Sequence, residues 1–520
     1  MNTIQAFSDL RPRPAHVGDI WKHWAQESPN STALLDANGH WSYVEFQSVI
    51  GRTKEFLLNA GVRPGDRVML VCENSREFIA LYFAVAEINA WPALVNARLS
   101  SQEVDQIREH CRARRVLFTS SASPHAMKHA KQQGAQFCQI EGMREIGLGP
   151  LNEAVQPEAL DPASGENVAA LIYTSGTTGQ PKGVMLTHAN LLFMAGHSAK
   201  IRSVGPQDRL LGVLPMSHAV GLAVVLLGTL VGGGSVYVCA RFDPPAILTA
   251  LEKDGISIMM GAPAMFALMT EFAKLKKIPQ FKSPKLRIIS SSGAPLQLSV
   301  KEETEKVFGM VLHNGYGVTE CSPTISLTRP GTPRKDTSVG RIFPDIDVRL
   351  VDQDDQEVGP GEVGELWVKG PNVMKGYYHA PEETAMAINA EGWFNTRDLA
   401  RIEDDHLFIV GRTKELIVRF GFNVYPAEVE AVLNTCAGVA RTAVIGRTAN
   451  AEEEIIAFVQ LVKNSLTTKE EIGAHAAKNL AAYKHPSQII VVDDLPLTPT
   501  GKVAKRELEK RFARELAAKT

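Results

Sequence analysis

The chain has 520 residues, more than one hydrophobic core normally supports, so two or more domains are expected. Hydrophobic residues make up 44% and charged residues 22%, and the formal net charge of −2 gives no overall attraction to nucleic acid or to an anionic membrane. The six cysteines are scattered without a CxxC spacing, which argues against a disulfide framework or a zinc site and favours a reducing compartment.

The chain ends and one apolar run bear on its location. The N-terminal MNTIQAFSDLRPRP lacks a secretory signal pattern, and the C-terminal AAKT is not a peroxisomal address. Residues 219–240 carry no charge over 22 residues, long enough to span a bilayer, but three consecutive glycines interrupt them at 232–234. A buried helix, a turn and a buried strand explain this run better, so we expect a cytoplasmic protein without a transmembrane segment.

The first two-thirds of the chain alternates predicted strands and helices. Residues 67–72 read as a buried strand, and residues 75–88 read as a helix with Phe78, Leu81, Tyr82 and Val85 on one face. Similar elements follow: a helix after Thr187, a strand near residues 257–260 and a strand at residues 286–290. This alternation predicts an α/β fold with parallel, doubly wound sheets.

From about Ser338 the pattern changes to short alternating strands and turns, which predicts a small antiparallel sheet or β-barrel over about residues 322–411. A more charged region follows, with a predicted helix at 427–433, strands at 442–445 and 455–461, and a terminal helix from Val503. We therefore expect an N-terminal domain over residues 1–411 and a smaller α+β domain over residues 412–520.

The stretch YTSGTTGQPKGV, residues 173–184, follows an apolar run and has the composition of a phosphate-binding loop. Its glycines let backbone N–H groups turn toward an anion, while threonine and serine hydroxyls and the Lys182 amine add donors. No Gly-Lys-Ser/Thr triplet closes it, so it is not the common P-loop. A Ser/Gly-rich surface loop is the alternative, and a helix start near residues 187–188 favours the phosphate loop.

Other stretches carry polar groups suited to a nucleotide. In NGYGVTE, Tyr316 can stack on a base, Thr319 can donate to a phosphate, and Glu320 can hold Mg²⁺, which prefers oxygen ligands. A tight turn with a buried tyrosine is the alternative. The small residues of SSSGAPL allow close approach to a flat ligand, and Asp398 in GWFNTRD can accept hydrogen bonds from ribose hydroxyls.

Eight stretches occur in a fixed order: YTSGTTGQPKGV, LPMSHAVGL, SSGAPL, NGYGVTE, GWFNTRD, GRTKELI, GFNVYPAEVE and PLTPTGKVAKREL. Together they resemble the adenylate-forming superfamily of acyl-CoA synthetases, nonribosomal adenylation domains and firefly luciferase, over nearly the whole chain. The resemblance implies a large N-terminal domain of two doubly wound sheets plus a small β-barrel, and a mobile C-terminal domain. It also implies two steps, in which a carboxylate attacks the α-phosphate of ATP and a thiol, usually of coenzyme A, then displaces AMP.

The resemblance assigns roles position by position. Glu320 matches the Mg²⁺ ligand, Lys414 the hinge, and Lys502 the lysine between the attacking carboxylate and the α-phosphate, where a fixed cation stabilises the transition state. His218 matches a gating or positioning residue, with a packed core histidine as the alternative. The expected catalytic set is Lys502, Thr319, Glu320 and His218. The expected ATP- and AMP-binding set is Thr174, Ser175, Gly176, Thr177, Thr178, Gly179, Lys182, Gly293, Ala294, Pro295, Asn314, Gly315, Tyr316, Gly317, Thr319, Asp398 and Arg412.

Two departures from the family pattern stand out. Arg397 occupies the position before Asp398 where the family usually has glycine, and arginine does not comfortably adopt a positive φ. After the hinge, the stretch 418–423 lacks the lysines and glutamine usual in plant hydroxycinnamate ligases. We expect Arg419, Gly421 and Phe422 to take part in binding coenzyme A instead.

The expected acyl pocket is small and apolar, without an arginine or lysine for a second carboxylate; its residues are His218, Val220, Gly261, Ser292, Gly315 and Val318. It predicts an apolar monocarboxylic acid, either a fatty acid or an aryl or cinnamyl-type acid. A fatty acid is favoured because Tyr316 is the one aromatic wall.

Three alternatives differ in what the chain does with the acid. One is an adenylation domain that loads a carrier-protein thiol, although MSHAVGLAVV lacks the aspartate typical of amino-acid-activating versions. A luciferase-like oxygenase is the second. The third is a non-catalytic ATP/AMP-binding regulator, which the intact Lys182, Glu320, Asp398 and Lys502 argue against. The sequence leaves open a homodimer, and acetylation of Lys502 is a hypothesis for regulation because it removes the charge.

Overall fold

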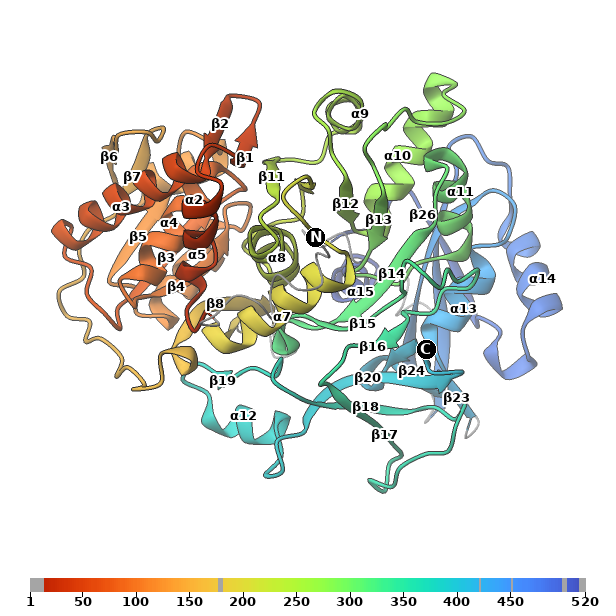
Figure 1. The fold of residues 1–520 in the computed structure, drawn as a ribbon. Helices are drawn as coiled ribbons and strands as arrows, with labels where there is room; N and C mark the ends of the chain where they lie inside the picture. The colour runs from red at the N-terminus through yellow and green to blue at the C-terminus, as the bar shows by residue number, and fades with distance from the viewer. Residues whose placement is uncertain (1–13, 176–180, 420–421, 450–451, 498–502, 514–520) are drawn as a thin grey trace.

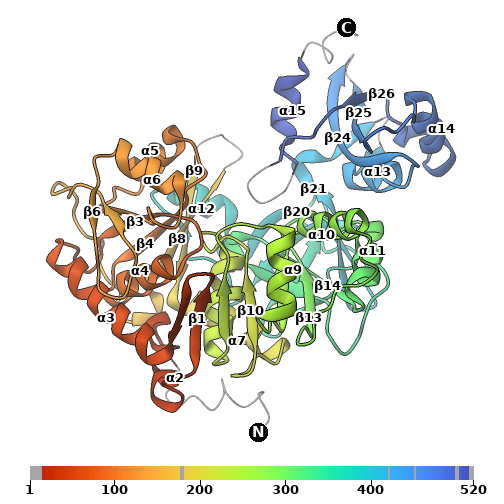
Figure 2. The same cartoon turned by 90° about the horizontal axis from the view of Figure 1, so that it is seen from above.

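The computed structural model describes residues 14–175, 181–419, 422–449, 452–497 and 503–513. Two large β-sheets make up most of the N-terminal part of the chain, and a smaller sheet lies below them in Figure 1. The C-terminal segment, blue in Figure 2, forms a smaller α+β domain that joins the rest beyond β21 (His406–Arg412). The predicted α/β fold, with a large N-terminal and a small C-terminal domain, is confirmed.

The first large sheet has the strand order β19-β9-β8-β4-β3-β5-β7-β6. Its central strands β5, β3, β4 and β8 run parallel, as predicted, whereas the pairs toward both edges are antiparallel. The strand bounds are β3 (Arg67–Cys72), β4 (Trp91–Asn96), β5 (Arg115–Phe118), β6 (Gln136–Cys138), β7 (Ile146–Leu148), β8 (Val168–Ser175), β9 (Pro181–Thr187) and β19 (Gly376–Tyr377).

The second large sheet has the order β16-β15-β14-β13-β12-β10-β11-β1-β2, with six parallel strands at its centre. Strand β1 reaches it from the N-terminal end of the described chain and pairs with β11. The strand bounds are β1 (Thr32–Asp36), β2 (Gly39–Ser42), β10 (Arg209–Gly212), β11 (Ser235–Val238), β12 (Ile258–Gly261), β13 (Ile288–Ser291), β14 (Leu312–Gly317), β15 (Thr324–Leu327) and β16 (Arg341–Ile342).

Helices cover the outer face of each sheet and also fill the space between the sheets. The helices α4, α7 and the π-helix η3 belong to a core shared by both sheets, while α5 and α6 cover one outer face and α9, α10 and α11 the other. The helix bounds in this part are η1 (Val17–Asp19), α2 (Lys22–Glu27), α3 (Tyr43–Asn59), α4 (Arg76–Glu87), α5 (Ser101–His110), α6 (Pro124–Gln132), η2 (Ser164–Glu166), α7 (His188–Ile201), η3 (Val220–Leu227), α8 (Gly228–Val231), α9 (Pro244–Lys253), α10 (Pro263–Lys276), α11 (Leu298–Phe308), η4 (Thr319–Cys321) and α12 (Pro381–Ala387).

Local sequence signals set several of these elements. Thr187 caps α7: its side chain accepts from the Asn190 N–H, and the Asn190 side chain accepts from the Thr187 N–H. The apolar run 219–240 forms η3, α8 and β11, which is the helix, turn and strand expected from the sequence. Among the described residues, no helix has both the length and the apolar character that crossing a membrane requires.

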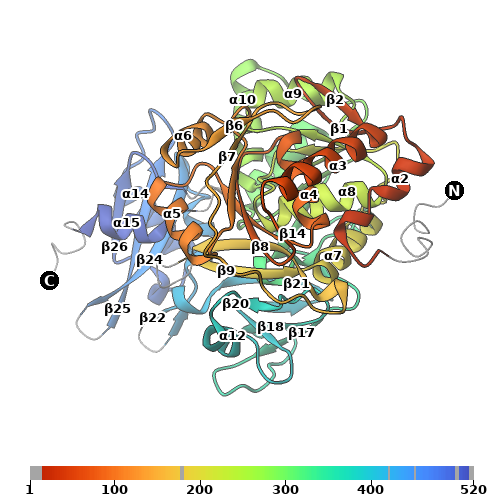
Figure 3. The ribbon, with the colours of Figure 1, turned by 90° about the vertical axis from the view of Figure 1, so that its left-hand side faces the viewer.

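The smaller sheet is antiparallel, with the order β17-β18-β20-β21. This small antiparallel sheet agrees with the sheet or β-barrel expected from the sequence, and an isolated bridge between Leu407 of β21 and Gly340 links it to the segment before β16. Strand β19 connects this region to β9 of the first large sheet, and Figure 3 shows α12 below β9 and next to β20. The bounds are β17 (Asp347–Val351), β18 (Gly364–Lys369) and β20 (Phe394–Glu403).

The C-terminal segment has its own core around β24 and β25. The predicted elements near residues 427–433, 442–445 and 455–461 are present, and the two strands are longer than predicted. The bounds are η5 (Thr413–Glu415), β22 (Ile417–Arg419), β23 (Phe422–Val424), α13 (Pro426–Leu433), β24 (Val439–Ala449), β25 (Glu452–Leu461), α14 (Lys469–Asn479), η6 (Ala482–Lys484), β26 (Gln488–Val492) and α15 (Lys505–Arg511).

Arg397 adopts the backbone conformation that the family pattern reserves for glycine. Its φ is 60°, in the left-handed region, because Thr396, Arg397 and Asp398 of β20 stand opposite Leu366 alone and form a bulge. The Arg397 N–H donates to Asn395 Oδ1 at 2.8 Å. The sequence has arginine where the family usually has glycine, and the backbone keeps the positive φ that suits glycine. Arg397 therefore adopts a strained φ.

We predict that relieving this strain leaves the fold intact. Arg397→Gly should keep or raise the free energy of unfolding, whereas Arg397→Val should lower it by about 1–2 kcal/mol, because a β-branched residue is worse still at positive φ. Urea unfolding of both variants checks this. A large loss of stability in Arg397→Gly would mean that the arginine side chain, rather than the backbone, matters at this position.

A second prediction concerns His188, which is buried at the start of α7. Its Nδ1 accepts a hydrogen bond from the Val17 N–H at 3.2 Å, and burial, together with His16, lowers the pKa of His188 from 6.5 to about 2. In the unfolded chain, His188 takes up a proton as the pH falls below 6.5, whereas in the folded chain it stays neutral down to about pH 2. Stability is therefore complete above pH 6.5 and falls on acidification, by at most about 1.4 kcal/mol per pH unit for this group.

His188→Asn should flatten the fall of the melting temperature between pH 6.5 and 4.5, measured by thermal unfolding. The exposed His125 provides the control, because His125→Asn should leave the wild-type acid dependence unchanged. An unchanged slope in His188→Asn would contradict the assignment.

Candidate active site

The residues expected around the acyl group lie at one edge of the second large sheet. Strands β10, β12, β13 and β14 are parallel neighbours, so their carboxyl ends meet there, which is where α/β folds bind ligands. Gly261 ends β12, and its carbonyl accepts from the Ser292 N–H at 3.1 Å. Gly315 lies in β14 and Val318 just beyond it, while Val220 begins η3. The structure thus brings segments from four strand ends together.

His218 lies on the loop between β10 and η3, and Asn74, two residues after β3 of the other large sheet, holds this loop. The Asn74 amide donates to the carbonyls of Gly212 (3.0 Å) and Leu214 (2.9 Å), and its oxygen accepts from the Met216 N–H (2.8 Å). Asn74 is buried. Sequence reasoning missed it, although a polar residue so close after the buried strand β3 was a usable signal.

Only glycine fits at Gly221 against this loop. A Cβ at Gly221 would lie 2.2 Å from the Pro215 carbonyl oxygen, so η3 packs directly on the segment that leads to His218. The side chain of His218 is half-buried. Its loop is therefore fixed from two sides, by Asn74 and by the start of the π-helix, which suits a positioning role.

Asp398 is the centre of the expected nucleotide site. Its buried carboxylate accepts from the Tyr316 hydroxyl at 2.5 Å through Oδ2 and from Arg412 Nε at 3.0 Å through Oδ1. Burial and the neighbouring Asp398 carboxylate raise the pKa of Tyr316 well above its usual value, so the phenol stays a donor. Burial would lower the pKa of Arg412, but the carboxylates of Asp398 and Glu415 outweigh it and leave that pKa raised. Three residues predicted separately are thus in direct contact.

The turn after β13 follows a strand that pairs with β14, which carries Tyr316. Gly293 has a φ of 87°, and no described atom lies within 4 Å of where its Cβ would stand, so the turn leaves room beside its backbone. Ala294 is half-buried and Pro295 exposed. The Asn314 amide donates to the carbonyls of Thr337 and Ser338, so this side chain holds the chain rather than facing a ligand with its donors.

Close packing also explains why position 317 is a glycine. A Cβ there would lie 1.9 Å from the Pro323 carbonyl oxygen, so the turn into η4 admits only glycine. Thr319 and Glu320 follow in η4, both half-buried.

Glu320 and Lys182 meet around Tyr377, which sequence reasoning did not single out. The Tyr377 hydroxyl donates to Glu320 Oε1 at 2.9 Å, and Lys182 Nζ lies 5.3 Å from the centre of the same ring. Burial is the largest influence on Glu320 and raises its pKa, and Asp398 adds to this, whereas hydrogen bonds from its own backbone N–H and from Tyr377 oppose it. Lys182 forms an ion pair with Glu383 of α12.

The structure describes only part of the predicted phosphate loop. Ser175, the last residue of β8, lies opposite Pro181, the first residue of β9, so the two strands form an antiparallel hairpin. Helix α7 begins only at His188, seven residues after Pro181. Sequence reasoning missed β9. Thr174 pairs with Lys182 across the hairpin. The predicted residues Gly176, Thr177, Thr178, Gly179, Gly421 and Lys502 lie outside the described residues.

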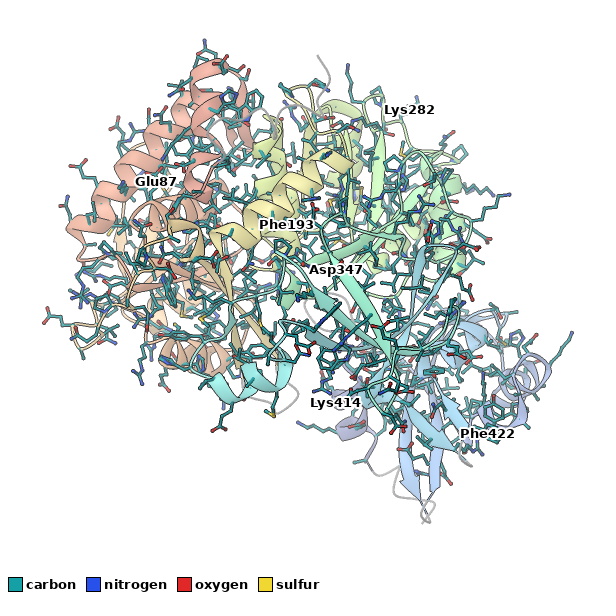
Figure 4. All side chains as sticks on the ribbon, turned by 60° about the horizontal axis from the view of Figure 1, so that its bottom comes forward. Glu87, Phe193, Lys282, Asp347, Lys414 and Phe422 are labelled. Atoms are coloured by element: carbon teal, nitrogen blue, oxygen red, sulfur yellow. The ribbon has the colours of Figure 1, made fainter. Side chains whose placement is uncertain are left out.

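The residues predicted for the hinge and for binding of coenzyme A lie at the start of the C-terminal segment. Lys414 is exposed in η5, and Figure 4 shows it where the four-stranded sheet meets that domain. Arg419 Nη1 donates to the carbonyls of His485 (2.6 Å) and Tyr483 (3.4 Å), which ties β22 to η6. Phe422, also labelled in Figure 4, is exposed and stacks on Tyr483 with ring centres 4.6 Å apart.

No cluster of three or more His, Cys, Asp or Glu side chains suited to a metal ion occurs in the described part of the chain. Mg²⁺ commonly binds through one or two carboxylates together with substrate phosphates. The Glu320 carboxylate, held by a tyrosine hydroxyl, has the hard oxygen chemistry for such a site.

Comparison with known proteins places the chain in a family. The sequence profile of the AMP-binding enzyme family matches residues 21–378, and that of the AMP-binding enzyme C-terminal domain matches residues 428–502. A feruloyl-CoA synthase of Amycolatopsis sp is 34% identical over 94% of this chain and 97% of its own. The long-chain-fatty-acid–CoA ligase FadD13 of Mycobacterium tuberculosis is 30% identical over 96% of this chain and 99% of its own.

Two solved structures of one enzyme are similar to this chain over nearly its whole length. ATP-bound MatB from Rhodopseudomonas palustris, 29% identical, has a TM-score of 0.83 over 95% of this chain and 99% of that one. Apo MatB, 28% identical, gives 0.74 over 96% of this chain and 99% of that one. The expectation of an ATP-binding, adenylate-forming enzyme is confirmed at this level, and the chain belongs to the AMP-binding enzyme family.

Proposed function

We propose that the chain is an AMP-forming acid–CoA ligase that acts on an apolar monocarboxylic acid. The observation that carries this proposal is the contact of Tyr316, Asp398 and Arg412, which come from three strands and form one polar group for a nucleoside. Glu320 and Lys182 lie around Tyr377 and offer a carboxylate for a metal and an amine for phosphates. The similarity to named CoA ligases supports coenzyme A as the acceptor.

In the proposed first step, the acid carboxylate attacks the α-phosphorus of ATP, the bond to the bridging oxygen breaks, and pyrophosphate leaves. Lys182 and the loop before it hold the departing phosphates, and Asp398 binds the ribose hydroxyls. Mg²⁺ held by Glu320 would neutralise phosphate charge. Lys502 stabilises the negative charge at the α-phosphate, and the chain needs no side-chain nucleophile because positioning and charge neutralisation carry the reaction.

In the proposed second step, the thiol of coenzyme A attacks the acyl carbon, and AMP leaves. The proposed role of His218 is positioning between the acyl pocket and the thiol path, and the fixed loop that carries it supports this role. Phe422, exposed on the C-terminal domain, is available to contact coenzyme A. Arg419 is engaged by carbonyls of its own domain, so its role would be to hold the β22–β23 hairpin that presents Phe422.

We infer that residues 1–411 and 412–520 act as two domains that hinge near Lys414. Support comes from the separate core of the C-terminal segment and from the exposed 3₁₀ turn that carries Lys414. The chain also matches ATP-bound MatB better than apo MatB, at similar identity, as expected where a domain changes position between states. The free cysteines fit a cytoplasmic location.

The acyl pocket supports an apolar acid but not one particular acid. The stretch from Val220 to Leu227 is apolar throughout and almost wholly buried. One relative is named for an aromatic acid and one for fatty acids, so both classes enter the test.

The first test measures pyrophosphate release from ATP and Mg²⁺ with a panel of fatty and cinnamic acids, with and without coenzyme A. We expect release with at least one apolar acid and an acyl-CoA product when coenzyme A is present. If no acid gave pyrophosphate release, the proposed ligase activity would be refuted. Pyrophosphate release without thioester formation would identify a ligase that loads a carrier-protein thiol.

The second test separates the two steps. Lys502→Ala should slow adenylation by about 10²–10³-fold, because one transition-state cation is lost, while thioester formation from supplied acyl-AMP continues. Lys510, an exposed lysine of α15, gives the control, and Lys510→Ala should slow neither step. Equal loss of both steps in Lys502→Ala would contradict the proposed use of different domain positions.

A further inference from the structure

Tyr377 is in contact with the two groups that the proposed function uses for the metal and the leaving phosphates. Its hydroxyl donates to Glu320 Oε1 at 2.9 Å. The face of its ring lies under the Lys182 amine, with Nζ 5.3 Å from the ring centre, a distance at which a cation is attracted to the ring. One side chain therefore touches both an acidic and a basic group of the site.

The backbone fixes this tyrosine. Tyr377 pairs with Val184 across the β19–β9 ladder, two residues from Lys182, and its N–H donates to Thr384 Oγ1 of α12 at 2.9 Å. Gly376 has a φ of 146°, and a Cβ there would lie 2.8 Å from Thr384 Cγ2, so the chain passes close against α12. The main chain of Tyr377 is thus fixed with respect to β9 and α12.

The same segment also holds the Glu320 backbone. The Met374 N–H donates to the Glu320 carbonyl at 2.8 Å, three residues before Tyr377. Glu320 is therefore tied to this segment at both its main chain and its side chain. Lys182 has a second partner in Glu383 of α12, which balances its charge.

We propose that Tyr377 is a positioning residue for metal-bound ATP, which sets the Glu320 carboxylate by its hydroxyl and the Lys182 amine by its ring face. The inference rests on the proposed roles of Glu320 and Lys182. Without the hydroxyl, the carboxylate loses the donor that orients it. A hydrogen bond to a charged group of this kind changes binding by about tenfold when it is removed.

The adjacent tyrosine supplies a matched control. Tyr378 also donates its hydroxyl to a glutamate, Glu158 Oε1 at 2.6 Å, but this glutamate is not part of the proposed site. Tyr377→Phe and Tyr378→Phe each remove one tyrosine hydroxyl from one carboxylate. Tyr377→Phe also keeps the ring under Lys182, so it isolates the contact with Glu320.

The test measures ATP binding by thermal shift as Mg²⁺ is titrated, with no acid present, so that no turnover is needed. Tyr377→Phe should require about tenfold more Mg²⁺ for the half-maximal shift, and Tyr378→Phe should match the wild type. Wild-type behaviour of Tyr377→Phe, or an equal change in both variants, would overturn the proposal. No Mg²⁺-dependent shift in the wild type would instead refute the proposed nucleotide site, and the inference with it.

Two further measurements guard against a general loss of structure. In steady-state kinetics, Tyr377→Phe should raise the KM for Mg²⁺–ATP and leave the KM for the acid unchanged, and a rise in both would overturn the proposal. In a Glu320→Gln background, adding Tyr377→Phe should change the Mg²⁺ midpoint by less than twofold, because the hydroxyl acts through that carboxylate. A further tenfold change in the double variant would show that the hydroxyl acts elsewhere.

Discussion

The buried carboxylate of Asp398 is the constraint on which the arrangement of the site depends. An ionised carboxylate away from water is costly unless hydrogen-bond donors or a cation accompany it. Tyr316 of β14 and Arg412 of β21 meet this need, one on each carboxylate oxygen. The second large sheet and the four-stranded sheet are therefore joined at this point by the hydrogen bond from Tyr316 to Asp398. The left-handed backbone of Arg397 belongs to the same constraint, because the bulge places Asp398 where both partners reach it.

The Glu320 carboxylate is a second acid that accepts a hydrogen bond from a tyrosine, here Tyr377. Glu320 lies in a half-buried position beside Asp398, and both its burial and this second carboxylate disfavour its charge. Lys182 lies over the Tyr377 ring, so acids and bases occur together around these residues: Asp398 is paired with Arg412, and Glu320 and Lys182 both contact Tyr377. A metal ion and a polyphosphate, which bring charge of both signs, complement such a pattern.

The sequence predicted the central elements of the fold well and the contacts between them poorly. The strand at residues 67–72 agrees with β3 to the residue, and the cap at Thr187 correctly marks the start of α7, because both depend on neighbouring residues. Strand β9 was missed because PKGV reads as a loop until β8 and β19 pair with it. Asn74 and Tyr377 were missed because the partners of their side-chain hydrogen bonds lie 57 to 142 positions away in the chain. The family pattern singled out Tyr316, Asp398 and Arg412, but only the fold shows that they touch.

The pairing of β1 with β11 has a consequence for how the protein is made. Leu34 lies opposite Val236, so β1 leaves the ribosome roughly 200 residues before its neighbour exists. At about 5–20 residues per second, that wait lasts about 10–40 s, during which the strand has an unpaired edge. Strand β19 likewise reaches β9 from nearly as far along the chain. The N-terminal domain therefore completes its sheets only late in translation, and a nascent chain interrupted before residue 235 would carry the aggregation hazard of an open sheet edge.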